Sequence, residues 1–233
     1  MTERLFFTHD HLTAELEVLS CTPHEEQFAV IVQSTIFHPQ GGGQPSDTGW
    51  LGDSQVLRVM QEAEQVVHYV DRPLEPGLVV ARVDAQRRAL HTRLHSAGHL
   101  IGNAGERLGW MPIKAHHWQG EGKITFIRGE TAQDMDAQAL QQRVNTWIAA
   151  DYSRHMTLED GTREVGFGDL PAYACGGTHV QALSELGQVT ILALSEKKAR
   201  SRCAMKSMRE EACLNAIQLS SVPLWELACL RKR

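Results

Sequence analysis

A change of hydrophobic period near residue 88 constrains the fold of this chain more than any other feature of its sequence. Before that point, short runs rich in Val and Ile alternate with breaks that contain Gly, Pro and polar residues. Such runs are typical of β-strands joined by turns. After it, apolar residues recur at intervals of three and four, as on one face of a helix. The sequence therefore predicts a β-rich first part and a second part that mixes helices with strands.

The first part is expected to form a small β-barrel, because its strands are short and evenly spaced. We assign residues 1–88 to this domain and place the glycine-rich segment described below in it. The expected strands are 14–20, 27–37, 54–60, 65–70 and 78–84.

The second part, residues 89–233, is expected to pack helices on an antiparallel sheet, so that the fold class is α+β. A long helix is predicted over residues 89–110, with Gly109 and Pro112 ending it. A second helix is predicted within 134–153, and a third in the tail that follows Ser207. Thr131 and Asp134 resemble the capping box of the second helix. Further strands are expected at 123–127, 162–167 and 188–195.

Composition excludes several classes of protein. No apolar run approaches the roughly 18–20 residues that a membrane-spanning helix needs, and the N-terminus lacks the apolar stretch of a signal peptide. We therefore expect a cytoplasmic protein without a membrane partner. The five cysteines are odd in number and scattered, which indicates reduced thiols. The net charge of −5 argues against indiscriminate nucleic-acid binding but allows a local basic strip.

Two short motifs carry metal-ligand chemistry. In "HSAGH", His95 and His99 stand four residues apart, on one face of the predicted helix. In "CGGTHV", two glycines let the chain turn so that Cys175 and His179 converge. Three imidazoles and one thiolate form a set suited to Zn²⁺. His91 competes with His95, since it also has a histidine four residues away, but the small residues between His95 and His99 leave more space beside a metal.

The segment "FHPQGGGQPSD" (37–47) contains three consecutive glycines, Gly41, Gly42 and Gly43. Such a run has a high conformational entropy cost on folding. Two interpretations stay open. Either a ligand approaches this backbone closely, or the glycines form a tight hairpin turn with positive φ.

These three motifs, in this order, resemble the alanyl-tRNA editing family: the editing domain of alanyl-tRNA synthetase and its free-standing AlaX relatives of medium length. The resemblance covers residues 27 to 205. It implies a hydrolase that removes serine, and sometimes glycine, from mischarged alanine tRNA in trans, with the acceptor end of tRNA(Ala) as its partner. Two alternatives stay open: a non-catalytic zinc-stabilised module that binds tRNA or a synthetase, and a zinc hydrolase of small esters or amides.

The resemblance also assigns residues. Zn²⁺ would be held by the histidine pair and the cysteine motif, while Thr35 would read the serine hydroxyl. Gly42 and its neighbours would lie against the aminoacylated adenosine, where Gln44 would contact the ribose or the ester. No general base is evident, although His91 and His116 are candidates. The matching positions are His95, His99, Cys175 and His179 for the metal, and Thr35, Gly41, Gly42, Gly43 and Gln44 for the substrate.

Some positions depart from the family pattern. His38 stands in a "FHPQ" step that usually reads differently, and Gly98 stands where many relatives have threonine, which puts selectivity or rate in doubt. A cationic track for tRNA is expected in "EKKARSR", with a second basic cluster near the first helix. The first of these contains Lys197, Lys198, Arg200 and Arg202, and the second contains Arg87, Arg88 and Arg93.

Overall fold

A computed structural model describes residues 1–197 and 200–207, so Lys198 and the helix predicted after Ser207 lie outside the described residues. No helix of the described part is long and apolar enough to cross a membrane. The helices are α1 (Ala85–Glu106) and α2 (Ala137–Ala149), with short 3-10 turns η1 (Leu5–Phe7) and η2 (Leu183–Leu186). The strands are β1 (Glu3–Arg4), β2 (Thr13–His24), β3 (Gln27–Val32), β4 (Ser34–Thr35), β5 (Gly49–Leu51), β6 (Ser54–Glu62), β7 (Gln65–Val70), β8 (Gly77–Val83), β9 (Trp110–His116), β10 (Lys123–Arg128), β11 (Arg154–Glu159), β12 (Thr162–Phe167), β13 (Tyr173–Ala174), β14 (Val189–Lys197) and β15 (Arg200–Ser207).

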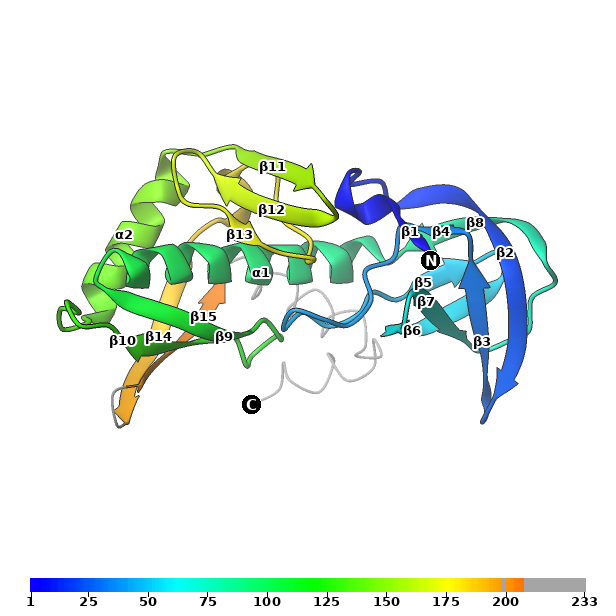
Figure 1. The fold of residues 1–233 in the computed structure, drawn as a ribbon, viewed down its shortest axis with the longest axis horizontal. Helices are drawn as coiled ribbons and strands as arrows, with labels where there is room; N and C mark the ends of the chain where they lie inside the picture. The colour runs from blue at the N-terminus through cyan, green and yellow to red at the C-terminus, as the bar shows by residue number, and fades with distance from the viewer. Residues whose placement is uncertain (198–199, 208–233) are drawn as a thin grey trace, which may run out of the picture.

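Six of the N-terminal strands pair in the order β2-β3-β7-β6-β5-β8, and β8 returns to pair with β2 (Figure 1). All six pairings in this closed ring are antiparallel. In β6, Ser54, Val56 and Val59 are buried while residues between them are exposed, so the strand puts one face into the core. This alternation is what the sequence pattern predicted, and it fills the interior with valine side chains.

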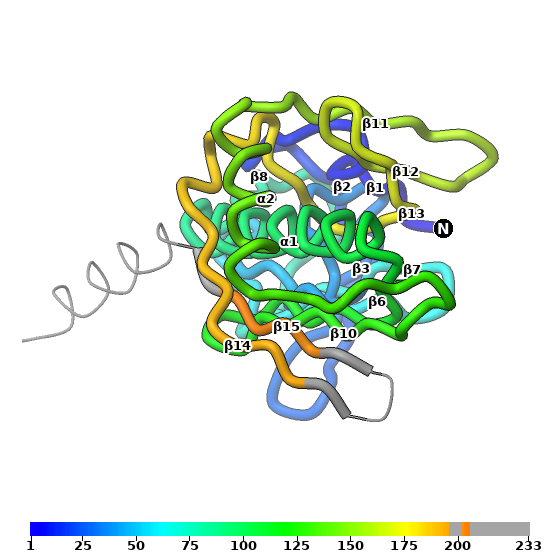
Figure 2. Tube along the Cα trace, turned by 90° about the vertical axis from the view of Figure 1, so that its left-hand side faces the viewer, coloured from blue at the N-terminus to red at the C-terminus, as the bar shows by residue number. Residues whose placement is uncertain are grey.

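The second part is built around α1, which lies between two sheets (Figures 1 and 2). A four-stranded sheet, in the order β14-β15-β10-β9, lies on one side, and β11, β12 and β13 lie on the other. Every residue of α1 from Leu94 to Gly105 is buried, so this stretch is enclosed on all sides rather than on one stripe. Small residues permit this packing, since a Cβ on Gly105 would lie 2.4 Å from a ring carbon of Phe126. The α+β class with mostly antiparallel sheets is confirmed.

Several predicted boundaries are wrong. Helix α1 ends at Glu106, and Pro112 does not follow a helix but lies in β9, an edge strand that tolerates a proline without a donor. Helix α2 is capped by Asp136, whose carboxylate accepts from the backbone of Ala139 at 2.7 Å, and not by Thr131 and Asp134. The predicted scheme also lacked β1, β5, β9, β11, β13 and β15.

A buried ion pair joins the N-terminal strands to α1. Arg88 donates to both carboxylate oxygens of Asp47 and, at 2.6 Å, to the carbonyl of Ile36. Asp47 also accepts from the backbone of His38 at 2.6 Å. Both charged side chains are buried. The pair therefore anchors the glycine-rich segment on the first turns of α1, while the predicted domain boundary at residue 88 stays a prediction.

Candidate metal centre

The two sequence motifs meet in space. One ligand atom from each of His95, His99, Cys175 and His179 lies within 4.8 Å of all the others. The Nε2 atom of His95 is 3.1 Å from the sulfur of Cys175, and the Nε2 atoms of His99 and His179 are also 3.1 Å apart. The cluster can hold a metal ion, and its donor set of three nitrogens and one sulfur is one that Zn²⁺ accepts. The pairing of His95 with His99 is thereby favoured over the competing pair, since His91 lies outside this cluster.

Gln44 orients one ligand of the cluster. Its side-chain oxygen lies 2.8 Å from Nδ1 of His95 and accepts from the backbone N–H of Thr178 at 3.1 Å. Because this oxygen can only accept, Nδ1 of His95 carries the proton and Nε2 keeps its lone pair for a metal. The amide nitrogen of Gln44 donates to the hydroxyl of Thr178 at 2.9 Å. Gln44 is fully buried, and its predicted contact with the ribose or the ester of a substrate stays a prediction.

The electrostatics suit metal binding. Burial lowers the pKa of His99 to about 3 and moves the pKa values of His95 and His179 well below their usual value. The three rings are therefore neutral at pH 7, the state in which imidazole ligates a metal. Burial raises the pKa of the Cys175 thiol, while the Gly177 N–H and the charge of a nearby arginine oppose this.

That arginine, Arg163, braces the cysteine motif and was not singled out from the sequence. Its guanidinium donates to the carbonyls of Cys175 at 3.0 Å and Gly177 at 2.9 Å, and to the carbonyl of Phe7 at 3.0 Å. It is 5% exposed, which is rare for a residue of this type. A buried arginine in a strand that pairs with β13 could be found only from the tertiary structure.

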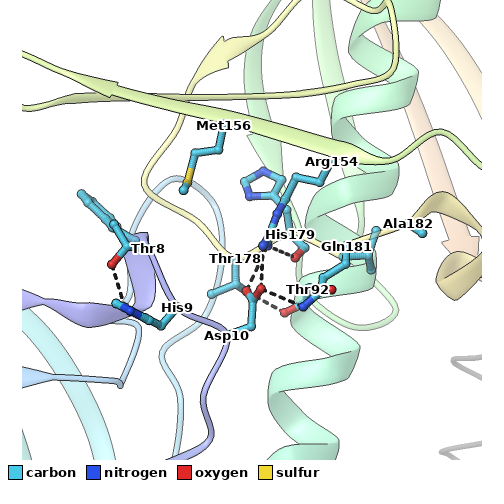
Figure 3. Close-up of polar contacts among 12 residues, drawn as sticks. Thr8, His9, Asp10, Thr92, Arg154, Met156, Thr178, His179, Gln181 and Ala182 are labelled. Carbon is cyan, nitrogen blue, oxygen red and sulfur yellow. Dashed lines mark hydrogen bonds and ion pairs between the residues drawn. The ribbon is translucent and has the colours of Figure 1, made fainter.

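A second arginine ties the N-terminal segment to the same loop. Arg154 donates to the carbonyl of His179 at 2.8 Å and to both carboxylate oxygens of Asp10, at 2.9 and 2.5 Å (Figure 3). Gln181 also donates to Asp10 at 3.2 Å. Burial alone would raise the pKa of Asp10, but its bonds to Arg154 and Gln181 lower it. The residues before β2 therefore help to support the loop that carries the candidate ligand His179.

The triple glycine forms a tight turn. The backbones of Gly41 and Gln44 exchange two hydrogen bonds, of 3.1 and 2.9 Å, and the residues between them, Gly42 and Gly43, have φ values of 57° and 79°. A Cβ on Gly43 would lie 2.5 Å from the carbonyl oxygen of Ala115, so this glycine lets the turn pack on β9. A Cβ on Gly42 would approach only the His95 ring, at 4.0 Å. The hairpin interpretation is confirmed for the backbone, and the exposed side of Gly42 remains open to a ligand.

A cleft of about 300 Å³ opens against the cluster. Three of the four candidate ligands line it, so the centre is reached from solvent and is not sealed inside the core. The opposite wall is the edge strand β9, where Lys114 is exposed. The remaining lining residues are Gly42, Gly98, Gly102, Pro112, Ile113, Ala115, His117, Ile124, Tyr173, Ala174 and Gly176.

His117 fills the space beside Gly98. Its ring stacks on that of His95, with centroids 4.3 Å apart and an interplanar angle of 24°. A Cβ at Gly98 would lie 2.2 Å from Cε1 of His117, so the glycine at this position is required by the histidine. The sequence did not single out His117, because its partner in this contact is 19 residues away and belongs to another element.

Other predicted residues do not meet at the cleft. Thr35 is fully buried, with its hydroxyl 2.8 Å from Nε2 of His68 and accepting from the backbone of Phe37. Thr35 is not among the lining residues of this cleft, and its predicted contact with a serine hydroxyl stays a prediction. The two candidate bases do not line the cleft either: His91 is buried elsewhere on α1, and His116 stacks on Trp118 and contacts Glu121.

The described part of the predicted tRNA-binding cluster belongs to the strands β14 and β15 of the four-stranded sheet. Lys197 in β14 pairs with Arg200 in β15, and Arg202 is exposed on the same strand. Arg88 of the second basic cluster is buried and forms an ion pair with Asp47.

Comparison with known proteins gives two findings. A family profile described as "Threonyl and Alanyl tRNA synthetase second additional domain" matches residues 162–202, which include the cysteine motif.

The chain is also similar to curated proteins. It is 30% identical to alanyl-tRNA editing protein Aarsd1 of Mus musculus and 31% identical to that of Rattus norvegicus, each over 218 residues, 78% of this chain and 52% of the relative. It is also 28% identical over 228 residues to the alanine–tRNA ligase of Methanothermobacter thermautotrophicus, and this match covers 82% of this chain and 24% of the ligase. The chain thus spans about half the length of the Aarsd1 relatives.

Proposed function

Because this chain belongs to the alanyl-tRNA editing family, we propose that it is a hydrolase that cleaves the ester of serine, and also of glycine, wrongly attached to alanine tRNA. The observation that carries the proposal is the position of the metal cluster on the wall of an open cleft. A purely structural zinc site is normally closed by its four ligands and buried away from substrate.

We further propose that the ion is Zn²⁺, held by His95, His99, Cys175 and His179. The neutral imidazoles, the thiol and the proton position on His95 fit this ion. When bound, Zn²⁺ supplies positive charge that can hold the aminoacyl group or polarise the ester carbonyl or a water molecule.

The residues of the chain provide the rest of the site. The turn at Gly42 and the backbone at Gly176 present no side chain that would obstruct a terminal nucleoside, since a Cβ at either glycine meets nothing closer than 3.8 Å. His117 and the small residues Gly98 and Gly102 of α1 line the space next to the cluster, where the aminoacyl group would lie. Lys114 stands at the wall where the polynucleotide would enter.

Such an activity has a clear physical need. A synthetase pocket that must accept alanine rejects serine only about a hundredfold, because an added hydroxyl is hard to exclude. A second site that hydrolyses the mischarged product therefore restores accuracy. The tRNA acceptor end would be the partner, and the cytoplasm the place of action.

The experiment is deacylation of seryl-, glycyl- and alanyl-tRNA(Ala) by the metal-loaded protein. We expect rapid release of serine, release of glycine, retention of alanine, and one zinc ion per chain. Gly42→Val should reduce serine release while zinc content stays at one, because a β-branched side chain at φ 57° is strained and enters the cleft. Gly161→Val is the matched control, since Gly161 has a similar φ of 76° with nothing near its Cβ position.

The outcomes separate the possibilities. Retention of all three amino acids by zinc-loaded protein would contradict hydrolysis and favour a binding module. Equal release of all three would indicate an unselective esterase. Equal losses in the Gly42 and Gly161 variants would show that strain, and not access to the cleft, explains the effect.

A further inference from the structure

The four-stranded sheet has a second face, on the side away from α1 (Figure 2). Ile124 and Phe126 of β10 and Cys203 of β15 are buried against the helix. Because successive side chains of a strand point to opposite faces, Thr125 and Arg202 project to the other side. The register of the sheet therefore fixes which residues share this outer face.

Cations from different strands are neighbours there. Thr125 pairs with Lys114 on one side and with Arg202 on the other, which forms a cross-strand row with a cation at each end. The next row pairs Lys123 with His116. Lys114, Lys123 and Arg202 are all exposed, and two strand spacings separate Lys114 from Arg202 by about 10 Å.

Apolar and aromatic groups lie beside these cations. Met111 and Ile127 pair across the strands and are 59% and 37% exposed. Trp118, which is 38% exposed, stacks on His116 with centroids 5.4 Å apart. An exposed tryptophan next to lysines is suited to a polymer with both phosphates and flat bases.

The charge of this face contrasts with that of the chain. The net charge of the chain is −5, yet the exposed ionic residues in the two described rows are the cations Lys114, Lys123 and Arg202. The carboxylate of Glu121 contacts His116 beside them. The backbone pair Lys197–Arg200 continues the register at the end of the same sheet. Lys114 belongs both to this face and to the lining of the metal cleft, so the two are continuous at β9.

We propose that this outer face binds the phosphate backbone of the RNA whose esterified end enters the cleft. This inference rests on the proposed function and names the surface that would hold its substrate. Lys123 and Arg202 contact phosphates, Lys114 contacts the phosphate nearest the cleft, and Trp118 receives an unpaired base. Arg202, the described side chain among the residues expected from "EKKARSR", would then be part of a larger surface to which β9 and β10 contribute.

The test is the salt dependence of binding of uncharged tRNA, which needs no hydrolysis. The double variant Lys123→Gln/Arg202→Gln should weaken binding at least tenfold at low salt. It should also reduce the slope of log K against log salt concentration by about 0.7–0.9 for each lost phosphate contact. The control is Arg72→Gln/Arg82→Gln, which removes the same charge from exposed positions on the barrel strands and the loop after them.

A second measurement separates this inference from the function itself. With seryl-tRNA(Ala), the Lys123/Arg202 variant should raise KM, whereas hydrolysis of the short ester 2′(3′)-O-seryl-adenosine should be unchanged. Unaltered tRNA affinity and salt slope, or equal weakening in the control variant, would overturn the inference. Failure of the wild-type protein to hydrolyse either ester would contradict the proposed function. The binding measurements with uncharged tRNA would still decide whether this face binds RNA, because they do not depend on hydrolysis.

Discussion

Replacing Gln44 by methionine isolates the support of the metal cluster from the cluster itself. The two side chains have similar length, but methionine cannot make the three hydrogen bonds of the glutamine amide, which measure 2.8, 3.1 and 2.9 Å. Two buried donors then lose their acceptor, namely Nδ1–H of His95 and the backbone N–H of Thr178. The variant leaves all four candidate metal ligands in place.

The magnitude follows from those donors. A buried donor without a partner costs about 1–3 kcal/mol, so the loss of stability should be about 2–6 kcal/mol before relaxation. Removing the hydrogen-bond partner of a metal-bound histidine typically lowers metal affinity 10–100-fold. Since a factor of ten corresponds to about 1.4 kcal/mol, the metal should bind about 1.4–2.8 kcal/mol less tightly.

The assay is competition for zinc against a chelator of known affinity, followed by thermal unfolding with and without metal. Gln44→Glu is the matched control, because its carboxylate keeps an acceptor for His95 and for Thr178 N–H, and the hydroxyl of Thr178 can donate in turn. The glutamate variant should retain zinc affinity within a few fold. A methionine variant that binds zinc as tightly as the wild-type protein would refute the reasoning, and so would a glutamate variant as weak as the methionine one.

Two further predictions concern buried histidines. Gly98→Ala should destabilise the protein by about 1–3 kcal/mol, because the added Cβ would overlap the His117 ring. This cost should be smaller in a His117→Ala background, which a double-mutant cycle of unfolding free energies would measure; additive effects of the two substitutions would contradict the contact. Burial lowers the pKa of His68 to about 4 in the folded protein, whereas in the unfolded chain this histidine takes up a proton near pH 6.5. The free energy of unfolding should therefore fall as the pH is lowered from about 6.5 to about 4, with a slope of up to about 1.4 kcal/mol per pH unit for this group. His68→Gln should flatten the pH dependence of unfolding by that amount, and an unchanged slope would contradict the assignment.

Part of this candidate site could be predicted from residues that are close together in the sequence. His95 and His99 are four residues apart on a helix, a spacing that places both on one face whatever surrounds them. The positive φ values at Gly42 and Gly43 follow from a turn that glycine adopts without strain. The edge strand β9 was not predicted, because Trp110 and Pro112 look like the end of a helix in isolation, whereas pairing with β10 makes them strand residues.

Several contacts between residues that are distant in the sequence were not predicted. Thr35 was predicted to contact a substrate, and the structure adds a buried contact between its hydroxyl and the ring of His68, 33 residues away. Gln44 was also predicted to contact a substrate, and folding places its side chain against His95, a candidate metal ligand 51 residues away.

The sequence alone determined the two motifs that carry the candidate metal donors, the turn at the glycines and the division between strand and helix periods, since each depends on residues close together in the chain. The tertiary structure decided which polar groups are buried, which hydrogen bonds they make, and where cations of separate strands line up beside the cleft. Burial and strand register are set only when segments that are distant in the sequence pack together. A polar group must then find a hydrogen-bond partner among its new neighbours, because an unpaired buried polar group is costly, and a local sequence pattern does not contain those neighbours.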